Sequence, residues 1–298
     1  MTKTTIFDAE TLAPDPGLTE RETTLLGFNL RYERVSDQLN LLLNKGEVDS
    51  WSRGKHGGVL PIAKLVADQY PLVVFHGDVG TGKTAIAECI ANRLLKESRT
   101  EDALIFRLSN RVRGSGLVGE MGSLLAEAFE RVTKAVGRNR RAVLIIDEGD
   151  SIAASRSQDQ SHHEDKVAVN TLIQGIDDMR RLQGRVAVIL CTNRLSALDP
   201  ALLRRAAIVE KFERPSEEAR RELLEMDLAG LNLGASEIEE LVSLSGPTDD
   251  RPGWTFSDFR TRFYPKAVAK AFPNSALTFE GLKAAALETS ASRVMEDC

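Results

Sequence analysis

The strongest pattern in the chain is the stretch Phe75-His76-Gly77-Asp78-Val79-Gly80-Thr81-Gly82-Lys83-Thr84-Ala85. It contains a complete G-x-x-x-x-G-K-T phosphate loop. The apolar run 72–75 that leads into it is typical of a buried strand, and Ile86, Ile90 and Leu94 after it lie on one face of a helix. The loop is therefore predicted to join a strand to a helix, which is the setting in which this motif binds a polyphosphate.

Each part of this loop suits a nucleotide. Glycines allow the backbone to pass close to the phosphates with its N–H groups turned inward, and the start of the following helix adds positive potential. The Lys83 ammonium would reach the β- and γ-phosphates of ATP, and the Thr84 hydroxyl would hold Mg²⁺. The alternative is a glycine-rich turn that only connects the strand to the helix. The residues predicted to bind the nucleotide are Gly77, Asp78, Val79, Gly80, Thr81, Gly82, Lys83, Thr84 and Ala85.

A second apolar run, 143–146, ends in two acids, Asp147 and Glu148. Strand ends on one edge of a parallel sheet converge on the ligand, so these acids are expected beside the phosphate loop. Asp147 would support Mg²⁺, and Glu148 would polarise the water that attacks the γ-phosphate. The alternative is that the two acids only open a solvated loop.

Two further polar sites follow along the chain. Asn193 ends the apolar run 188–192 and is a candidate to hydrogen-bond the attacking water or the γ-phosphate. Arg204 and Arg205 follow a short apolar helix, and an arginine fork binds phosphate oxygens in a bidentate way. Taken alone, each motif favours a simpler interpretation: Asn193 caps the next turn, and the two arginines are a solvated pair on a helix surface.

Apolar runs and helical patterns alternate from residue 72 to residue 212, which predicts an α/β fold with a parallel sheet covered by helices on both faces. Only helical patterns follow Pro215, so a small all-helical domain is expected there. The predicted strands are 72–75, 103–108, 142–147, 186–191 and 208–212, and the predicted helices between them are 85–97, 123–136 and 166–180.

Three regions follow from these patterns. Residues 1–22 are polar and carry Pro14, Pro16 and Gly17, so they are predicted to form a flexible arm. Residues 23–214 form the α/β domain, with a helix near 35–43 and a loop over 46–58, and residues 215–298 form the helical domain.

Composition limits the class of protein. A net charge of -5 and an aromatic content of 5% argue against a general affinity for nucleic acid. The three cysteines are far apart and form neither a disulfide framework nor a zinc motif, which suits the cytoplasm. The start of the chain lacks a secretory signal pattern, and no apolar run is long enough to cross a membrane.

Together the motifs resemble the AAA+ ATPases. Over about residues 25–272 they come in the order of that family: phosphate loop, Asp-Glu strand, Asn-tipped strand, arginine finger and helical lid. Gly149-Asp150-Ser151 and the run 170–177 are similar to the AAA clade, whose members remodel proteins. The resemblance implies a P-loop domain with a helical lid, the cofactors ATP and Mg²⁺, and a homo-oligomeric, typically hexameric, ring.

A closer resemblance is to the pachytene-checkpoint-type remodellers of HORMA-domain proteins, including a short form from bacterial antiviral signalling (CBASS). It rests on Arg205-Ala206 and the run 208–212, where most of the clade has Pro-Gly-Arg, and on the stretch 116–125, which is similar to a pore loop. It implies that Arg205, with Arg204 second, is the finger that reaches a neighbour's ATP. It also implies a central pore lined by Leu117 and Val118, for which the alternative is ordinary packing beneath the loop.

By this resemblance the partner is a HORMA-domain client, with an associated nucleotidyltransferase. Two departures from the family pattern stand out. About seventy residues precede the phosphate loop, where relatives usually carry an adaptor-binding domain, and the pore loop has an aliphatic pair in place of an aromatic residue. The family also places an arginine in the lid against the nucleotide. Arg260 is the candidate for that role, with Arg262 as an alternative, although Phe259 occupies the aligned position.

The sequence therefore predicts an ATPase that remodels a HORMA-domain client through a central pore. One alternative is a nucleic-acid motor or loader that uses Arg107, Arg111, Arg113 and the basic run 138–141. Another is a slow, ATP-gated scaffold, which would have no need of a water-activating acid such as Glu148.

Overall fold

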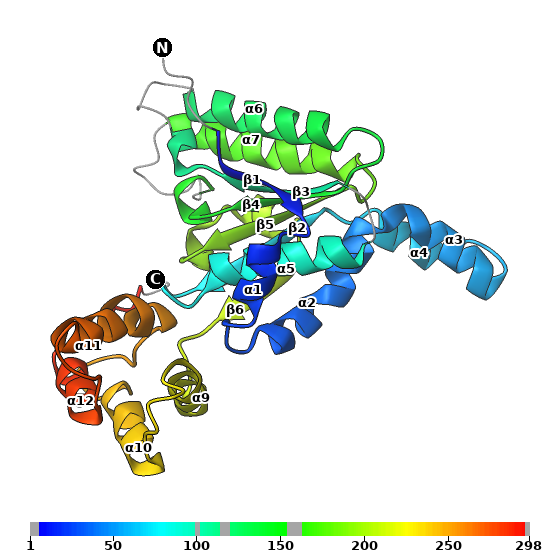
Figure 1. Cartoon of the computed structure of the whole chain (residues 1–298). Coiled ribbons are helices and arrows are strands. Elements are labelled where there is room, and N and C mark those ends of the chain that lie inside the picture. Colours follow the sequence, from blue (N-terminus) through cyan, green and yellow to red (C-terminus); the bar gives the residue numbers. More distant parts are fainter. Residues whose placement is uncertain (1–5, 99–101, 114–119, 154–162, 296–298) are drawn as a thin grey trace. The chain divides into compact units, whose positions relative to one another are not determined.

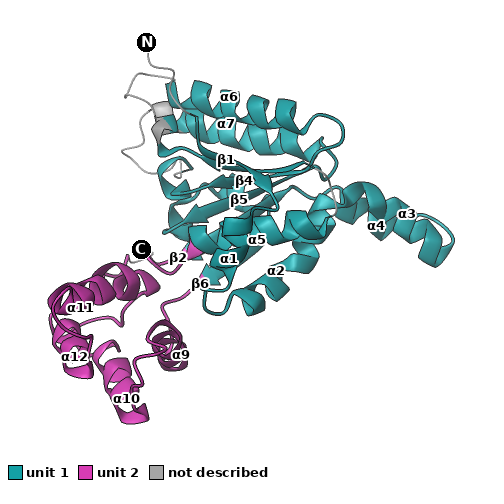
Figure 2. Ribbon diagram, in the orientation of Figure 1, with its two compact units in different colours: residues 1–76, 84–211, 297–298 teal, residues 77–83, 212–296 magenta. Residues whose placement is uncertain are grey.

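The computed structural model describes residues 6–98, 102–113, 120–153 and 163–295. The chain divides into two compact units (Figure 2). The first unit holds residues 1–76 and 84–211, and the second unit holds residues 77–83 and 212–296. The phosphate loop thus groups with the helical C-terminal part, while the helix that follows the loop groups with the sheet.

The first unit is built on a six-stranded sheet with the order β1-β3-β4-β5-β2-β6. β2 pairs with β5, β3 with β4 and β4 with β5 in parallel, whereas β1 pairs with β3 in antiparallel orientation. The strands are β1 (Phe7–Ala13), β2 (Leu72–Gly77), β3 (Ala103–Leu108), β4 (Ala142–Ile146), β5 (Val186–Thr192) and β6 (Ala206–Phe212). The predicted α/β fold is confirmed, with one antiparallel edge strand that the sequence did not indicate.

Helices cover both faces of this sheet. α6 and α7 lie over one face, and α1, α2 and α5 lie over the other (Figure 1). Every residue of β4 and β5 is buried, as expected for central strands that are covered on both sides. The helices of this unit are α1 (Pro16–Glu22), α2 (Phe28–Leu43), α3 (Lys45–His56), α4 (Pro61–Ala67), α5 (Lys83–Glu97), α6 (Glu120–Val136), α7 (His163–Arg180) and α8 (Pro200–Leu203).

The region predicted as a flexible arm has regular structure from residue 7 onward. Residues 7–13 form the edge strand β1, and 16–22 form α1. The backbone N–H of Asp15 donates to Asn92 Oδ1 at 2.6 Å, and its side chain caps α1 by accepting from the Leu18 N–H at 2.8 Å. The prediction failed because an edge strand with one exposed face is mostly polar, and because Pro16 stands at the first turn of a helix, where proline is tolerated.

Residues 46–58, predicted as a loop, instead lie mostly in α3. Glycine and serine lower the intrinsic helix propensity of this stretch, but Val48 and Ser52 are buried in the fold, and such packing outweighs propensity.

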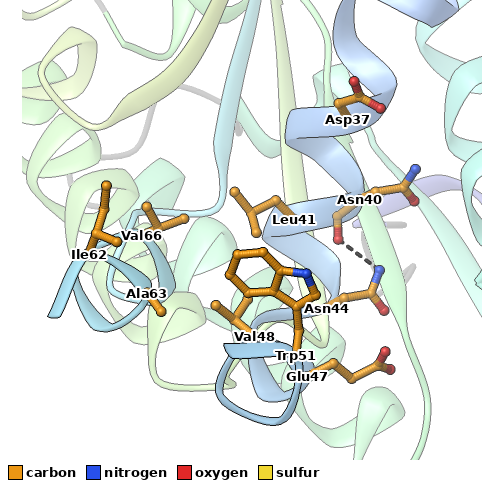
Figure 3. Close-up of a pocket in the computed structure, with 10 residues that line it drawn as sticks. All are labelled: Asp37, Asn40, Leu41, Asn44, Glu47, Val48, Trp51, Ile62, Ala63 and Val66. Carbon is orange, nitrogen blue, oxygen red and sulfur yellow. Dashed lines mark hydrogen bonds between the residues drawn. The ribbon is translucent and has the colours of Figure 1, made fainter. Parts of the chain in front are cut away.

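An apolar groove with a volume of about 520 Å³ lies between α2, α3 and α4. Trp51, which is 52% exposed, lies in it together with Leu41 and Val66 (Figure 3). The only charged residues in its lining are carboxylates, so the groove offers no cation to a phosphate. The lining residues are Asp37, Asn40, Leu41, Asn44, Glu47, Val48, Trp51, Ile62, Ala63 and Val66.

Apart from the phosphate loop, the second unit consists of the C-terminal residues 212–296, and its regular structure from residue 217 onward is helical, as predicted. A π-helix over Asp258–Phe263 leads directly into α11. The buried rings of Trp254, Phe259 and Phe263 pack against one another with centroids 5.1–6.3 Å apart. The α-helices are α9 (Glu217–Asp227), α10 (Ala235–Leu244), α11 (Tyr264–Ala271) and α12 (Phe279–Leu287). None of the helices in the described ranges is long and apolar enough to cross a membrane.

The packing of α6 on α7 gives a test of the fold. A Cβ added to the buried Gly175 of α7 would lie 2.3 Å from Cδ2 of Phe129 on α6. Gly175→Ala should therefore lower the free energy of unfolding by about 1–3 kcal/mol, as overpacked cores do. Urea denaturation measures the change. Gly54→Ala in α3 is the control, because a Cβ there meets nothing within 4 Å. Equal stability of the two variants would contradict the helix packing described here.

Candidate nucleotide site

The phosphate loop has a backbone that only glycine adopts readily. Gly77, Gly80 and Gly82 have φ angles of 141°, 78° and 91°. A Cβ on Gly77 would lie 2.0 Å from the carbonyl oxygen of Phe212, and one on Gly80 would lie 2.7 Å from Oγ1 of Thr255. The glycines thus serve both the turn and close packing within the second unit.

Lys83 lies at the end of this loop and at the start of α5. Its side chain is buried, with the residue 6% exposed, and its ammonium donates to the carbonyl oxygens of Gly77 at 2.9 Å and Asp78 at 2.8 Å. The Thr81 hydroxyl donates to the same Asp78 oxygen at 2.8 Å. A buried cation, a helix N-terminus and a wrapped backbone fit the polyphosphate that the sequence predicts here.

The two candidate Mg²⁺ ligands lie side by side in the first unit. The Thr84 hydroxyl donates to Oδ2 of Asp147 at 2.8 Å, and the backbone N–H of Glu148 donates to Oδ1 of the same carboxylate at 2.8 Å. A hydroxyl and a carboxylate at this distance fit the oxygen ligands that Mg²⁺ prefers. The structure therefore brings together the pair that the sequence assigned to the metal.

Glu148 stands in a strained backbone conformation directly after β4. Its φ and ψ are 51° and 45°, the left-handed region that residues other than glycine seldom adopt. It starts the short turn 149–151, and its carbonyl oxygen accepts from the N–H of Ser151 at 2.9 Å. A Cβ on Gly149 would lie 2.4 Å from Cδ2 of Leu190, so a larger residue there would require Leu190 to move. Such strain is typical of functional positions.

Asp150 is a positioning residue whose role the sequence did not indicate. Its Oδ1 accepts from the Thr192 hydroxyl at 2.9 Å and from the backbone N–H of Asn193 at 3.3 Å. Asp150 thereby ties the turn after β4 to the end of β5, where Asn193 lies half-buried. The only sequence signal was its place in a clade-typical tripeptide, which says nothing about its partners.

The two candidate finger arginines differ sharply. Arg205 binds Asp177 through two hydrogen bonds, Nε to Oδ1 at 2.6 Å and Nη2 to Oδ2 at 3.0 Å. Its guanidinium also lies 5.1 Å from the centroid of the Tyr70 ring, and the bond to Asp177 raises its pKa. Arg204 is exposed, and its side chain has no hydrogen-bond or ion-pair partner among the described residues. Within one subunit Arg205 is thus held by its own chain.

The remaining predicted residues lie as follows. In the second unit, Arg260 binds Asp227 with distances of 3.2 and 3.1 Å, and Arg262 lies 3.3 Å from Asp258. Phe259 is a core residue with no exposed surface. The predicted pore residues, Leu117 and Val118, lie outside the described residues.

Comparisons with known proteins agree with this geometry. The family model described as "ATPase family associated with various cellular activities (AAA)" matches residues 73–214. A CD-NTase-associated protein 6 of Escherichia coli (strain KTE188) is 63% identical over 282 residues, which are 95% of this chain and 95% of that protein. Another, from E. coli (strain MS 115-1), is 40% identical over 92% of this chain and 90% of that protein.

Solved structures that are similar over nearly the whole chain include two Trip13-related ones. A chain of the E. coli MS115-1 HORMA:CdnC:Trip13 complex has a TM-score of 0.88 and 36% identity, covering 98% of both chains. Rhizobiales Trip13 has a TM-score of 0.71 and 30% identity, covering 97% of this chain and 100% of that one.

The sheet and its phosphate loop define a P-loop nucleotide-binding protein. Given the identity and coverage of these relatives, the chain belongs to the AAA ATPases, within the family of CD-NTase-associated protein 6. The resemblance that the motifs indicated is thereby confirmed.

Lys83→Ala tests whether the loop binds ATP. Removing the buried ammonium should weaken ATP binding about a hundredfold or more, because it takes away charge-assisted hydrogen bonds to the phosphates. Isothermal titration calorimetry measures the change. Lys96→Ala is the matched control, since Lys96 is an exposed residue of the same helix. Unchanged affinity in Lys83→Ala would refute the site.

Proposed function

We propose that this chain hydrolyses ATP as a ring of identical subunits and thereby remodels a HORMA-domain protein in a bacterial antiviral signalling system. The observation that carries this proposal is the likeness to a chain of the HORMA:CdnC:Trip13 complex, which extends over 98% of both chains. A client of the same class is the simplest expectation for a chain with the same architecture. The name of the closely similar relatives, CD-NTase-associated protein 6, supports a nucleotidyltransferase as a further partner.

Hydrolysis requires an oriented water and a stabilised γ-phosphate. Thr84 and Asp147 would hold Mg²⁺, which supplies charge neutralisation between the phosphates when bound. Lys83 would leave the loop carbonyls for the phosphate oxygens. Glu148 would accept a proton from the attacking water, and Asn193, whose backbone is fixed by Asp150, would orient that water or the γ-phosphate.

A ring, hexameric by family resemblance, would complete the site with an arginine from the neighbouring subunit. The sequence favoured Arg205 for this role, with Arg204 second. The bidentate pair between Arg205 and Asp177 now supports the opposite order, since leaving it would cost two charge-assisted hydrogen bonds. We propose that Arg204 is the finger and that Arg205 fixes the turn that presents it.

The two alternative functions receive less support. Of the arginines that a nucleic-acid motor would use, Arg107 is paired with Glu88 at 2.9 Å and Arg141 with Glu47 at 3.3 Å. An arginine that is paired with a carboxylate neutralises phosphates less well, so its contact displaces fewer counterions from nucleic acid. A slow scaffold would not require the strained Glu148.

The remaining parts of the proposal concern the client and the location. Leu117 and Val118 would grip an extended client segment by apolar contact in the central pore. We place this activity in the cytoplasm, where thiols stay reduced: Cys89 and Cys191 are buried thiols, and burial raises the pKa of the Cys89 thiol to about 11.

Glu148→Gln tests the function directly. The amide should keep ATP bound but slow turnover about 10²–10⁴-fold, since it cannot accept the proton of the attacking water. A stalled ring should then retain its client. Purification of the tagged variant after co-expression with a HORMA-domain protein from the same genome should recover both proteins when ATP is present.

Glu127→Gln is the control, because Glu127 is an exposed residue of α6. Wild-type ATP turnover by Glu148→Gln would place catalysis elsewhere. Normal stalling without client retention would leave the ATPase intact and refute the client.

Subunit mixing tests the finger. Lys83→Ala subunits retain the arginine, and Arg204→Ala subunits retain the phosphate loop, so each alone should be inactive. Mixed rings contain interfaces with both parts intact and should regain part of the ATPase activity. An ATP turnover assay over a series of mixing ratios measures this. Recovery with Arg205→Ala in place of Arg204→Ala, and none with Arg204→Ala, would return the role to Arg205.

A further inference from the structure

The phosphate loop itself carries an acid, Asp78. A carboxylate beside a bound polyphosphate is unfavourable, because like charges repel strongly where water is partly excluded. The Asp78 side chain is only 12% exposed, so water screens it little. The loop therefore needs a cation to offset this charge.

Arg214 provides that cation from the start of the helical part of the same unit. Its guanidinium lies 2.6 Å from Oδ2 of Asp78, and it also donates to the carbonyl oxygens of Gly253 at 2.5 Å and Ser292 at 2.8 Å. The side chain is 15% exposed. One arginine thus joins the phosphate loop to two distant segments of the second unit.

The C-terminal segment, residues 290–295, reaches the same acid. The backbone N–H of Met295 donates to Oδ1 of Asp78 at 3.2 Å. Ser292 is anchored beside it, donating its backbone N–H and its hydroxyl to the buried Asp258 at 3.1 and 2.6 Å. Although burial alone would raise the pKa of Asp258, these bonds and those from Thr255 hold it below its usual value. The segment is therefore fastened to the unit at one point and to the loop at another.

Asp78 also connects this segment to the phosphate-binding lysine. Its side-chain Oδ1 accepts from the Val79 N–H at 2.9 Å, which sets the direction of the loop. Its carbonyl oxygen accepts from the Lys83 ammonium. A movement of the Asp78 carboxylate can thus reach the Lys83 ammonium through a single residue, because Lys83 binds the carbonyl oxygen of Asp78.

We propose that Asp78 is a positioning residue through which Arg214 and the C-terminal segment set the affinity of the phosphate loop for nucleotide. Paired with Arg214, the carboxylate holds the loop open without repelling ATP. When ATP draws Lys83 away from the Asp78 carbonyl, the shift passes through the carboxylate to Arg214 and to residues 290–295. This inference rests on nucleotide binding at the loop, as proposed above.

Nucleotide affinity in a charge-rescue series tests the proposal. Arg214→Ala leaves Asp78 unpaired beside the phosphates and should raise the Kd for ATP about tenfold or more. The double variant Asp78→Asn/Arg214→Ala removes the repelling charge as well, so its Kd should return most of the way to that of the wild type. A purely structural role for the pair predicts the reverse, since the double variant loses more hydrogen bonds than the single one.

Arg221→Ala is the matched control, because Arg221 forms an exposed ion pair with Glu239 in the same unit. Thermal unfolding confirms that each variant is folded, and Arg214→Lys, which keeps the charge, should bind ATP nearly as the wild type does. A double variant that binds no better than Arg214→Ala would overturn the charge role. No ATP binding by the wild-type protein would instead refute the proposed function itself.

Hydrogen–deuterium exchange tests the link to the C-terminal segment. Adding a non-hydrolysable ATP analogue to the wild-type protein should change the exchange of residues 290–295, and Asp78→Asn should abolish that change while the analogue still binds. An equal change in both proteins, or none in the wild type, would show that Asp78 does not connect the loop to this segment.

Discussion

The rest of the candidate site depends on the closeness of two backbones at the entry to the phosphate loop. At Gly77 a single added carbon would lie 2.0 Å from the carbonyl oxygen of Phe212, so no side chain fits. Gly80 is similarly constrained by Thr255. This contact explains why a loop that follows β2 in sequence groups with residues 212–296. The backbone of the phosphate loop and the C-terminal helices thus belong to the same compact unit.

Three charged groups of the site are paired within the chain itself. Lys83 donates to carbonyls of its own loop, Asp147 accepts from Thr84, and Asp78 is held by Arg214. A buried polar group without a partner is costly, so each of these contacts stabilises the fold of the loop and its surroundings. Under the proposed function, binding would be an exchange of partners: the Lys83 ammonium would give up the loop carbonyls for phosphate oxygens, and the Thr84 hydroxyl oxygen would coordinate Mg²⁺. The shape of the loop and its affinity for nucleotide would then be coupled.

Much of this was predictable from the sequence, for physical reasons. Central strands are continuous apolar runs, and a phosphate loop requires its glycines and lysine, so β2, β4 and the pairing of Thr84 with Asp147 followed from local patterns. Edge strand β1 and helix α3 could not be predicted in this way. Their segments are polar or contain glycine, and tertiary contacts outweigh the low intrinsic propensity of such sequences for regular structure. Asp150 was missed for a related reason: its partners, Thr192 and Asn193, lie at and just after the end of β5, about forty residues away.

The arginines show most clearly where sequence reasoning ends. Neighbouring positions with the same side chain are equivalent in a motif, yet Arg205 is bound by Asp177 and stacked on Tyr70 while Arg204 is exposed. A side chain that acts on a neighbouring subunit must be exposed and unpaired in its own subunit. A side chain that orders its own turn must instead be bound within that subunit. In the proposed ring both tasks would be needed, since an exposed arginine on a mobile turn would lose entropy on reaching a phosphate. Arg205, held by Asp177, would keep the turn in place, and the exposed Arg204 would then reach the neighbouring subunit at a lower entropic cost.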